Sequence, residues 1–484
     1  MLSSSRSPET GEPTRWTVAA YVYALVAAAG FGYFLFAVPV QLTDSFGNLV
    51  QVRTGTLWSQ IYAQLHQASY LRPLLWGHLR VIADLSGGHY YEWFRWWHVG
   101  QVAVLMLLFV RLLRVRTPAH FAVVPLGLAA LAGVHTFAGT VREAFPINTF
   151  MTILLCCFVA ADLALGPPRW WRSVMACVVM VFAALTVESG LLVAVVFAAA
   201  WLAGARGVSG RGVMAVVAVV AGYLWLRFVF LDVGSPGLME RTSAFGFGKL
   251  EPRDLMARFG ANPLPFYVYN VVSSIASVLF AEPRAGEYAM TRDLLAHELK
   301  TWQYVAVTAS TLGTLVIAAF AWARRGEWWR LRFDRDDQLV IIFVAMTGFN
   351  AFISYAYTKD VIMSPAGAFF ALALAVATRR VAIGGVPEGS EGGRFSWRTA
   401  VATVLLCVMS SAWAIRAVGI HVGLRHSALV MRNEWAYADL WFANEGQRPT
   451  GDAVRLKDQL QSDAVSRHPA PAFFVGDWLR WFED

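Results

Sequence analysis

The sequence predicts an all-α protein that crosses a membrane many times. Of its 484 residues, 57% are hydrophobic and only 15% are charged, whereas a soluble chain carries about 25% charge. The mean hydropathy is +0.50, and the apolar residues gather in runs of about 20, the length of a spanning helix. Basic residues cluster in some gaps between these runs and are scarce in others. These observations indicate a polytopic membrane protein.

Eleven apolar runs define the predicted spans. The fifth and sixth are short and nearly continuous, with only Glu188, Ser189 and Gly190 between them. A twelfth run, 264–281, contains Pro265 and follows Pro263 directly, so it is ambiguous. The eleven predicted spans lie near 16–39, 93–112, 119–137, 147–165, 171–187, 189–205, 212–231, 303–323, 337–357, 361–378 and 398–420.

The positions of the basic residues predict the orientation. Cytoplasmic segments of membrane proteins carry an excess of Lys and Arg. With a cytoplasmic N-terminus, the short outer loops hold only Arg142 and Lys359. If 264–281 crossed the membrane, the last two basic clusters would move outside, so we predict that it is re-entrant or interfacial. The clusters assigned to the inside are Arg111/Arg114/Arg116, Arg206/Arg211, Arg324/Arg325/Arg330/Arg332/Arg335 and Arg379/Arg380.

This topology divides the chain into three parts. Residues 1–15 form a cytoplasmic tail, 16–420 the membrane domain with outer loops 41–92 and 232–302, and 421–484 a small external segment. The net charge of +8 follows the topology and does not indicate nucleic acid. All four cysteines lie in apolar runs, which argues against disulfides and thiolate metal sites.

No nucleotide-binding motif is present in the sequence. There is no P-loop and no Gly-rich fingerprint, and 381–394 reads as a flexible linker. We therefore expect a substrate delivered at the outer face or within the bilayer, and we expect no cofactor. A divalent ion at Asp44 with Glu143 or Glu188 is a less favoured alternative.

Asp44 follows the first apolar run and is predicted to lie just beyond the outer membrane surface. A carboxylate there is open to water and close to lipid. Displacing a lipid phosphate at an anomeric carbon needs a deprotonated acceptor, and the phosphate leaves without a proton. One carboxylate base can therefore suffice, whereas ordinary glycosidases use a pair.

Three segments resemble GT-C-fold glycosyltransferases that use polyprenyl-phosphate sugars, nearest to the TMTC-type transmembrane O-mannosyltransferases. The segment SYLRPLL (69–75) is similar to the family's run after its catalytic loop, with one residue inserted. LTVESGLL (185–192) is similar to its Lys-Glu-Ser-Gly turn, although Val187 replaces the basic residue. YTKD (357–360) is similar to a basic outer turn before a late membrane helix. The segment 421–484 is too short for the family's helical repeat domain, which we do not expect in this segment.

The resemblance implies a GT-C-like bundle that transfers sugar to a glycan, lipid or protein acceptor at the outer face of a bacterial inner membrane. It implies Asp44 as the catalytic base, with inversion. Arg suits phosphate oxygens through its bidentate fork, so Arg72, Arg142 and Lys359 are predicted to bind the donor phosphate. Each could instead anchor a helix end to lipid headgroups. The residues predicted to orient the acceptor are Glu143, Glu188 and Tyr357.

Two alternatives belong to other functional classes. A flippase or transporter for lipid-linked glycans is disfavoured because we find neither repeated halves nor an acidic residue in the middle of a span. An O-antigen ligase or polymerase would place essential Arg and His residues in a late outer loop. Loop 232–302 contains such residues, namely Arg241, Arg253, Arg258 and His297.

Overall fold

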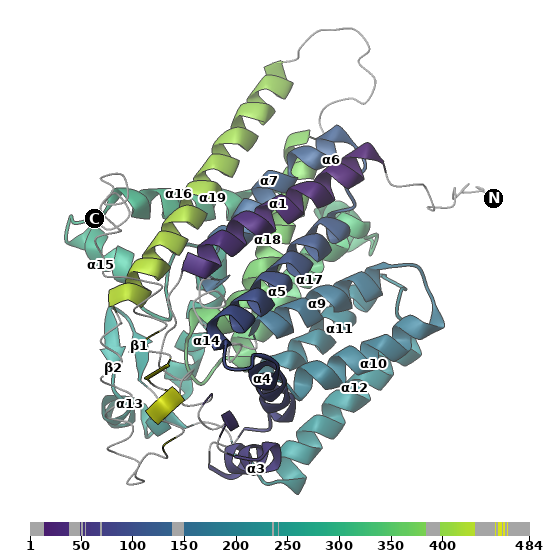
Figure 1. Cartoon of the computed structure of the whole chain (residues 1–484). Helices are drawn as coiled ribbons and strands as arrows, with labels where there is room; N and C mark the ends of the chain where they lie inside the picture. The colour runs from purple at the N-terminus through teal and green to yellow at the C-terminus, as the bar shows by residue number, and fades with distance from the viewer. Residues whose placement is uncertain are drawn as a thin grey trace.

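The computed structural model describes residues 14–37, 49, 52–53, 55–67, 70–137, 150–234, 237–240, 242–383 and 397–430, with a few positions between 451 and 462. Within these residues the chain is mostly helical (Figure 1). Seven helical segments are long and apolar enough to cross a membrane, and each coincides with a predicted span. The all-α polytopic membrane class is therefore supported.

The apolar helical segments are of two lengths. The long ones are built on α1 (Arg15–Ala37), α5 (Tyr90–Leu113), α12 (Gly210–Trp225) with the π-helical turn Leu226–Phe230, α16 (Thr301–Trp329), α17 (Arg335–Ile353), η4 (Asp360–Met363) with α18 (Ser364–Thr378) and the π-helical turn Arg379–Ile383, and α19 (Trp397–Val430). The shorter apolar helices are α6 (Pro118–Ala122) with α7 (Val124–Gly133), α9 (Phe150–Leu165), α10 (Trp170–Ala184), η1 (Glu188–Leu191) with α11 (Leu192–Leu202), and α14 (Leu264–Leu279).

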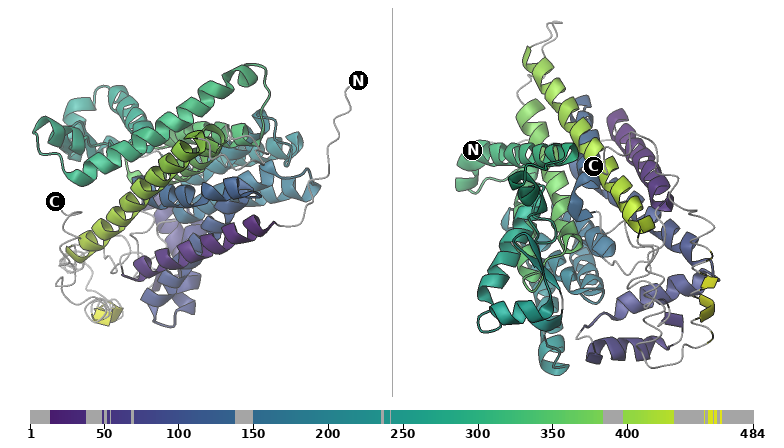
Figure 2. Two further views of the ribbon diagram at one scale, coloured as in Figure 1. Left: turned by 90° about the horizontal axis from the view of Figure 1, so that it is seen from above. Right: turned by 90° about the vertical axis from the view of Figure 1, so that its left-hand side faces the viewer.

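Helix α18 forms the centre of the bundle. Of its most apolar 18-residue window, 94% is buried inside the protein. It packs against α5, α7, α9, α16 and α17, and α19 runs beside α7 and α16 (Figures 1 and 2). Its sequence SPAGAFFALALAVAT alternates small and bulky residues. Small residues let membrane helices approach closely, which compensates for the absence of a hydrophobic driving force between helices in lipid.

The basic clusters share one end of the bundle, where many of them cap helices. Arg335 Nη1 donates to Leu165 O at 2.8 Å, and Arg379 Nη1 donates to Leu113 O at 2.7 Å. These carbonyls belong to the last turns of α9 and α5, whose C=O groups have no partner within the helix. The arginines assigned to one membrane side are thus positioned to satisfy helix C-termini at that end.

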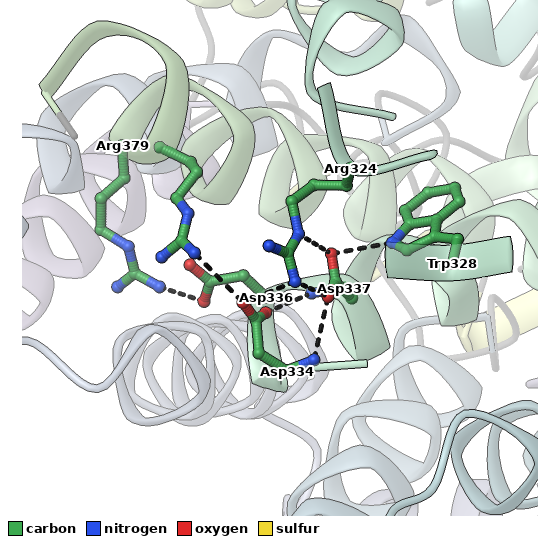
Figure 3. A network of polar contacts seen from close by, with 7 residues as sticks. Arg324, Trp328, Asp334, Asp336, Asp337 and Arg379 are labelled. Carbon is green, nitrogen blue, oxygen red and sulfur yellow. Dashed lines mark hydrogen bonds and ion pairs between the residues drawn. The ribbon is translucent and has the colours of Figure 1, made fainter. Parts of the chain in front are cut away.

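A network of carboxylates completes this basic end (Figure 3). Arg324 donates to both oxygens of Asp337 at 3.0 and 2.7 Å, and Trp328 Nε1 donates to the same carboxylate at 2.9 Å. Asp334 caps α17 by accepting from the Asp337 amide at 3.0 Å. Arg379 pairs with Asp336. The network fixes the α16–α17 turn against the end of α18.

The two long segments that were predicted as outer loops lie at the opposite end. In its described part, the predicted loop 41–92 contains the helices α3 (Leu57–Gln67) and α4 (Pro73–Leu85), and its last residues already belong to α5. The predicted loop 232–302 contains the 3₁₀ turn Leu238–Glu240, α13 (Pro252–Phe259), α14 and α15 (Ala289–Leu295). It also holds a short antiparallel hairpin, β1 (Ser243–Phe245) with β2 (Gly248–Leu250). The all-α prediction did not include this hairpin.

Both flanks of α14 lie at this same end. The amide of Tyr288, which follows α14, donates to Gly246 O, which precedes it, at 2.9 Å. The Tyr269 hydroxyl donates to Gly286 O at 2.5 Å. The segments before and after α14 are therefore close in space.

Candidate functional site

The candidate site forms where α4, η1 and the end of α12 meet. The amide of Leu74, in the first turn of α4, donates to Leu185 O at 3.0 Å, which ties α4 to the α10–η1 turn. Gly190 permits that turn, because a Cβ on it would lie 2.1 Å from Ala183 O. The turn places Glu188 opposite Arg72, the N-cap residue of α4.

Glu188 bridges two guanidinium groups. Arg72 Nε and Nη2 donate to Glu188 Oε2 at 3.1 and 2.7 Å. Arg227 Nη1 lies 3.3 Å from Glu188 Oε1. Burial tends to lower the pKa of Arg72, but the Glu188 carboxylate outweighs it and holds that pKa above its usual value. The group therefore contains two positive charges and one negative charge.

Aromatic side chains surround this group. The Arg72 guanidinium lies 3.8 Å from the centre of the Tyr70 ring, within the range of a cation–π interaction. Arg227 Nη1 lies 3.5 Å from the Tyr223 hydroxyl. Tyr357 lies within electrostatic range of Arg72, which brings the α17–α18 turn to the same group. Lys359 is in that turn and is exposed.

A second ionic cluster includes another residue of the α17–α18 turn. It contains His135, which follows α7, together with Asp360 at the start of η4 and Arg416 in α19. Arg416 Nη2 contacts His135 Nδ1 at 3.2 Å, and His135 Nε2 lies 3.9 Å from Asp360 Oδ1. Arg284, in the loop after α14, lies within electrostatic range of His135 and Arg416.

The structure brings together three of the seven predicted site residues, Arg72, Glu188 and Tyr357. Arg72 and Glu188 form an ion pair, and Tyr357 lies near Arg72 with Lys359 in the same turn. Asp44, Arg142 and Glu143 lie outside the described residues, and their assignments stay predictions. Among the residues that the structure describes, no three His, Cys, Asp or Glu side chains form a group that could hold a metal ion.

Sequence reasoning missed Arg227, Arg416 and His135, although a signal was present. Each is an ionisable residue inside or at the end of a predicted apolar run, and such residues are costly in lipid and are often functional. Arg284 and Asp360 were missed for another reason. They lie in or beside polar segments, where a charged side chain is common and does not indicate a functional role.

No known protein family, curated protein or solved structure matches this chain.

Proposed function

We propose that this protein is an integral-membrane glycosyltransferase that takes sugar from a polyprenyl-phosphate donor. The observation that supports it best is the pairing of Arg72 and Arg227 around Glu188 at the end of the bundle opposite the basic clusters. Two guanidiniums around one carboxylate leave a net positive charge, which favours a phosphate. Arg forks match phosphate oxygens bidentately, and Arg72 uses only Nε and Nη2 for Glu188 among the hydrogen bonds described.

The roles differ in one respect from those expected from the sequence. Glu188 was expected to orient the acceptor, but both of its oxygens are engaged by arginines. In this proposal Glu188 positions Arg72 and Arg227 for the departing phosphate. Asp44 stays the proposed base, taking the acceptor's proton as its oxygen attacks the anomeric carbon with inversion. Lys359 and Arg142 are proposed to stabilise the phosphate, and Glu143 and Tyr357 to orient the acceptor.

The proposal includes a bacterial inner-membrane location with eleven spans, a cytoplasmic N-terminus and an external C-terminus. Its support is the position of the arginines that cap helix C-termini. The capping arginines share one end with the loops assigned to the cytoplasm. The hydrogen bond between Tyr288 and Gly246 supports a re-entrant α14, which is what keeps the late arginine clusters inside.

The decisive experiment replaces Asp44 by Asn. The variant keeps its size but cannot accept a proton at neutral pH, so sugar transfer should fall by roughly 10²–10⁴-fold. Transfer is measured with purified protein and a synthetic polyprenyl-phosphate sugar, while donor binding is followed separately and should persist. Asp254→Asn, an exposed carboxylate on α13, is the matched control. Near-normal transfer by Asp44→Asn would exclude Asp44 as the base and direct attention to Glu143.

The same assay tests the phosphate contacts. Lys359→Ala and Arg72→Ala should raise the apparent KM for the donor, because the loss of one charged hydrogen bond is worth about 1.5–3 kcal/mol. Wild-type donor kinetics in both variants would show that these two residues only anchor helix ends.

A ligase for lipid-linked glycans is the second candidate function. It is favoured by Arg284, which belongs to the segment 232–302 and lies near His135 and Arg416. Such an enzyme would take its glycan from a lipid diphosphate, so the two candidates differ in the donor that supports transfer. A flippase would move the lipid in acceptor-free liposomes without releasing it.

A further inference from the structure

The His135–Arg416 cluster is assembled from separate parts of the chain. Arg416 Nη1 donates to Ala306 O at 3.2 Å and to the Ser310 hydroxyl, so α19 is joined to α16. The Ser364 hydroxyl donates to Thr136 O at 2.6 Å, which joins the start of α18 to the residue after His135. Neither Arg416 nor His135 is more than 6% exposed. The cluster is therefore a fixed feature of the bundle.

Hydrogen-bond chemistry defines the protonation of His135. A guanidinium can only donate, so Nδ1 of His135 accepts from Arg416 Nη2 and the neutral ring carries its proton on Nε2. Among the residues that the structure describes, that proton has no acceptor within hydrogen-bonding distance. Asp360 Oδ1 lies 3.9 Å away and accepts instead from the Ala285 amide at 2.6 Å. Arg416 Nε also has no hydrogen-bond acceptor among the described residues. Two buried donors thus lack acceptors.

The positive charge of Arg416 is not balanced by a nearby carboxylate among the described residues. Among the residues that the structure describes, no carboxylate lies within 4.0 Å of the guanidinium of Arg416 or Arg284. Asp360, whose side chain is 26% exposed, and Glu282 lie within electrostatic range of Arg284. A buried cation without a partner is strongly unfavourable. An anion with several acceptor oxygens would satisfy both the charge and the unpaired donors.

We propose that His135, Arg284 and Arg416 form a second phosphate-binding site, separate from the Arg72–Glu188–Arg227 group. The α17–α18 turn contributes to both, with Tyr357 near Arg72 and Asp360 near His135. A phosphate monoester or diester provides tetrahedral oxygens for donors that arrive from different helices. Arg416 lies in a membrane-length helix, so the natural source is a lipid headgroup or a free phosphate ion. The proposal concerns binding and does not require sugar transfer.

The test measures phosphate binding to the full-length protein in phosphatidylcholine nanodiscs. The two probes are a synthetic polyprenyl phosphate and inorganic phosphate, and the readouts are the dissociation constant and the number of phosphates bound. Arg416→Gln and Arg284→Gln should each weaken one binding event at least about tenfold, as expected for a charged hydrogen bond. Lys249→Gln removes one positive charge from exposed strand β2 and should leave binding unchanged. Arg72→Gln should weaken only the other event.

Thermal stability separates binding from a merely structural role. If Arg416 is held for a ligand, Arg416→Gln should unfold no earlier than the wild type without phosphate, and it should lose the phosphate-induced rise in Tm. Arg416→Lys should recover part of that rise. Binding by the lipid probe alone would identify a headgroup site, whereas equal displacement by inorganic phosphate would identify a free-ion site.

Two results would overturn the proposal. One is unchanged phosphate binding in both Arg416→Gln and Arg284→Gln. The other is a single bound phosphate that Arg72→Gln abolishes. If Arg416→Gln fails to fold, the half-buried Arg284 decides the matter. Absence of sugar transfer with both phosphates bound would refute the proposed enzyme and leave this site standing.

Discussion

Replacing Glu188 by Gln tests the central geometry of the candidate site. The substitution preserves shape but removes the single negative charge between Arg72 and Arg227. The amide oxygen can still accept one hydrogen bond, while the amide nitrogen must face donors. Glu188 is 17% exposed and the two arginines are 21% and 6% exposed, so the pair is mostly but not fully removed from water.

The magnitude follows from this burial. Removing one partner of a fully buried ion pair costs about 3–5 kcal/mol, because the other charge is left uncompensated. The partial exposure of Glu188 and Arg72 reduces this, and we expect a loss of about 2–4 kcal/mol in the free energy of unfolding. Asp84→Asn breaks the exposed pair with Arg80 on α4, whose side chains are 50% and 37% exposed. That control should lose only about 0.3–0.5 kcal/mol.

The assay is unfolding in mixed micelles with an increasing fraction of SDS, followed by tryptophan fluorescence. Both variants are compared with the wild type at the same pH and ionic strength. Added salt should reduce the loss of unfolding free energy by a larger fraction in Asp84→Asn than in Glu188→Gln. The reason is that salt screens exposed ion pairs much more than buried ones. An equal loss of stability in the two variants would refute the assignment of Glu188 as the residue that holds two arginines.

Two further predictions concern topology and pH. A reporter fused after Pro283 should read external and one fused after Arg325 cytoplasmic, and a cytoplasmic result at Pro283 would require α14 to cross the membrane. Burial lowers the pKa of His78 on α4 to about 4, so the unfolded chain binds more protons than the folded one between about pH 6.5 and pH 4. Stability should fall through this window as the pH falls, by up to about 3 kcal/mol, and His78→Asn should flatten the slope measured by thermal unfolding at each pH. A slope unchanged in His78→Asn would assign the effect to other groups.

The sequence was sufficient for the membrane class and for the positions of the long helices. Hydropathy depends on neighbours along the chain, so runs such as 303–323 and 361–378 coincide with α16 and with η4 and α18. It was less informative for loop 41–92, where α3 and α4 are amphipathic and too polar to be recognised as spans. The hairpin at 243–250 was also missed, because three-residue strands leave almost no periodic pattern.

For the site as well, the sequence indicated individual residues and the structure showed which of them are in contact. Arg72 and Glu188 were chosen separately, each from its place beside a predicted helix end, and the structure joins them across 116 residues of sequence. The resemblance of 69–75 and 185–192 to a known family did not include this pairing. Arg227, just after α12, was recognised as a site residue only from the structure. Nothing in the apolar sequence around it indicated a carboxylate partner.

The amino-acid sequence alone therefore determined which segments are apolar and where charges interrupt them. The tertiary structure decided which charges meet, because ion pairs such as Arg72–Glu188 and contacts such as His135–Arg416 join residues that are remote along the chain. The physical reason is that burial in lipid is a property of each helix by itself. Satisfying a buried charge, in contrast, requires a partner that only the packing of several helices can supply.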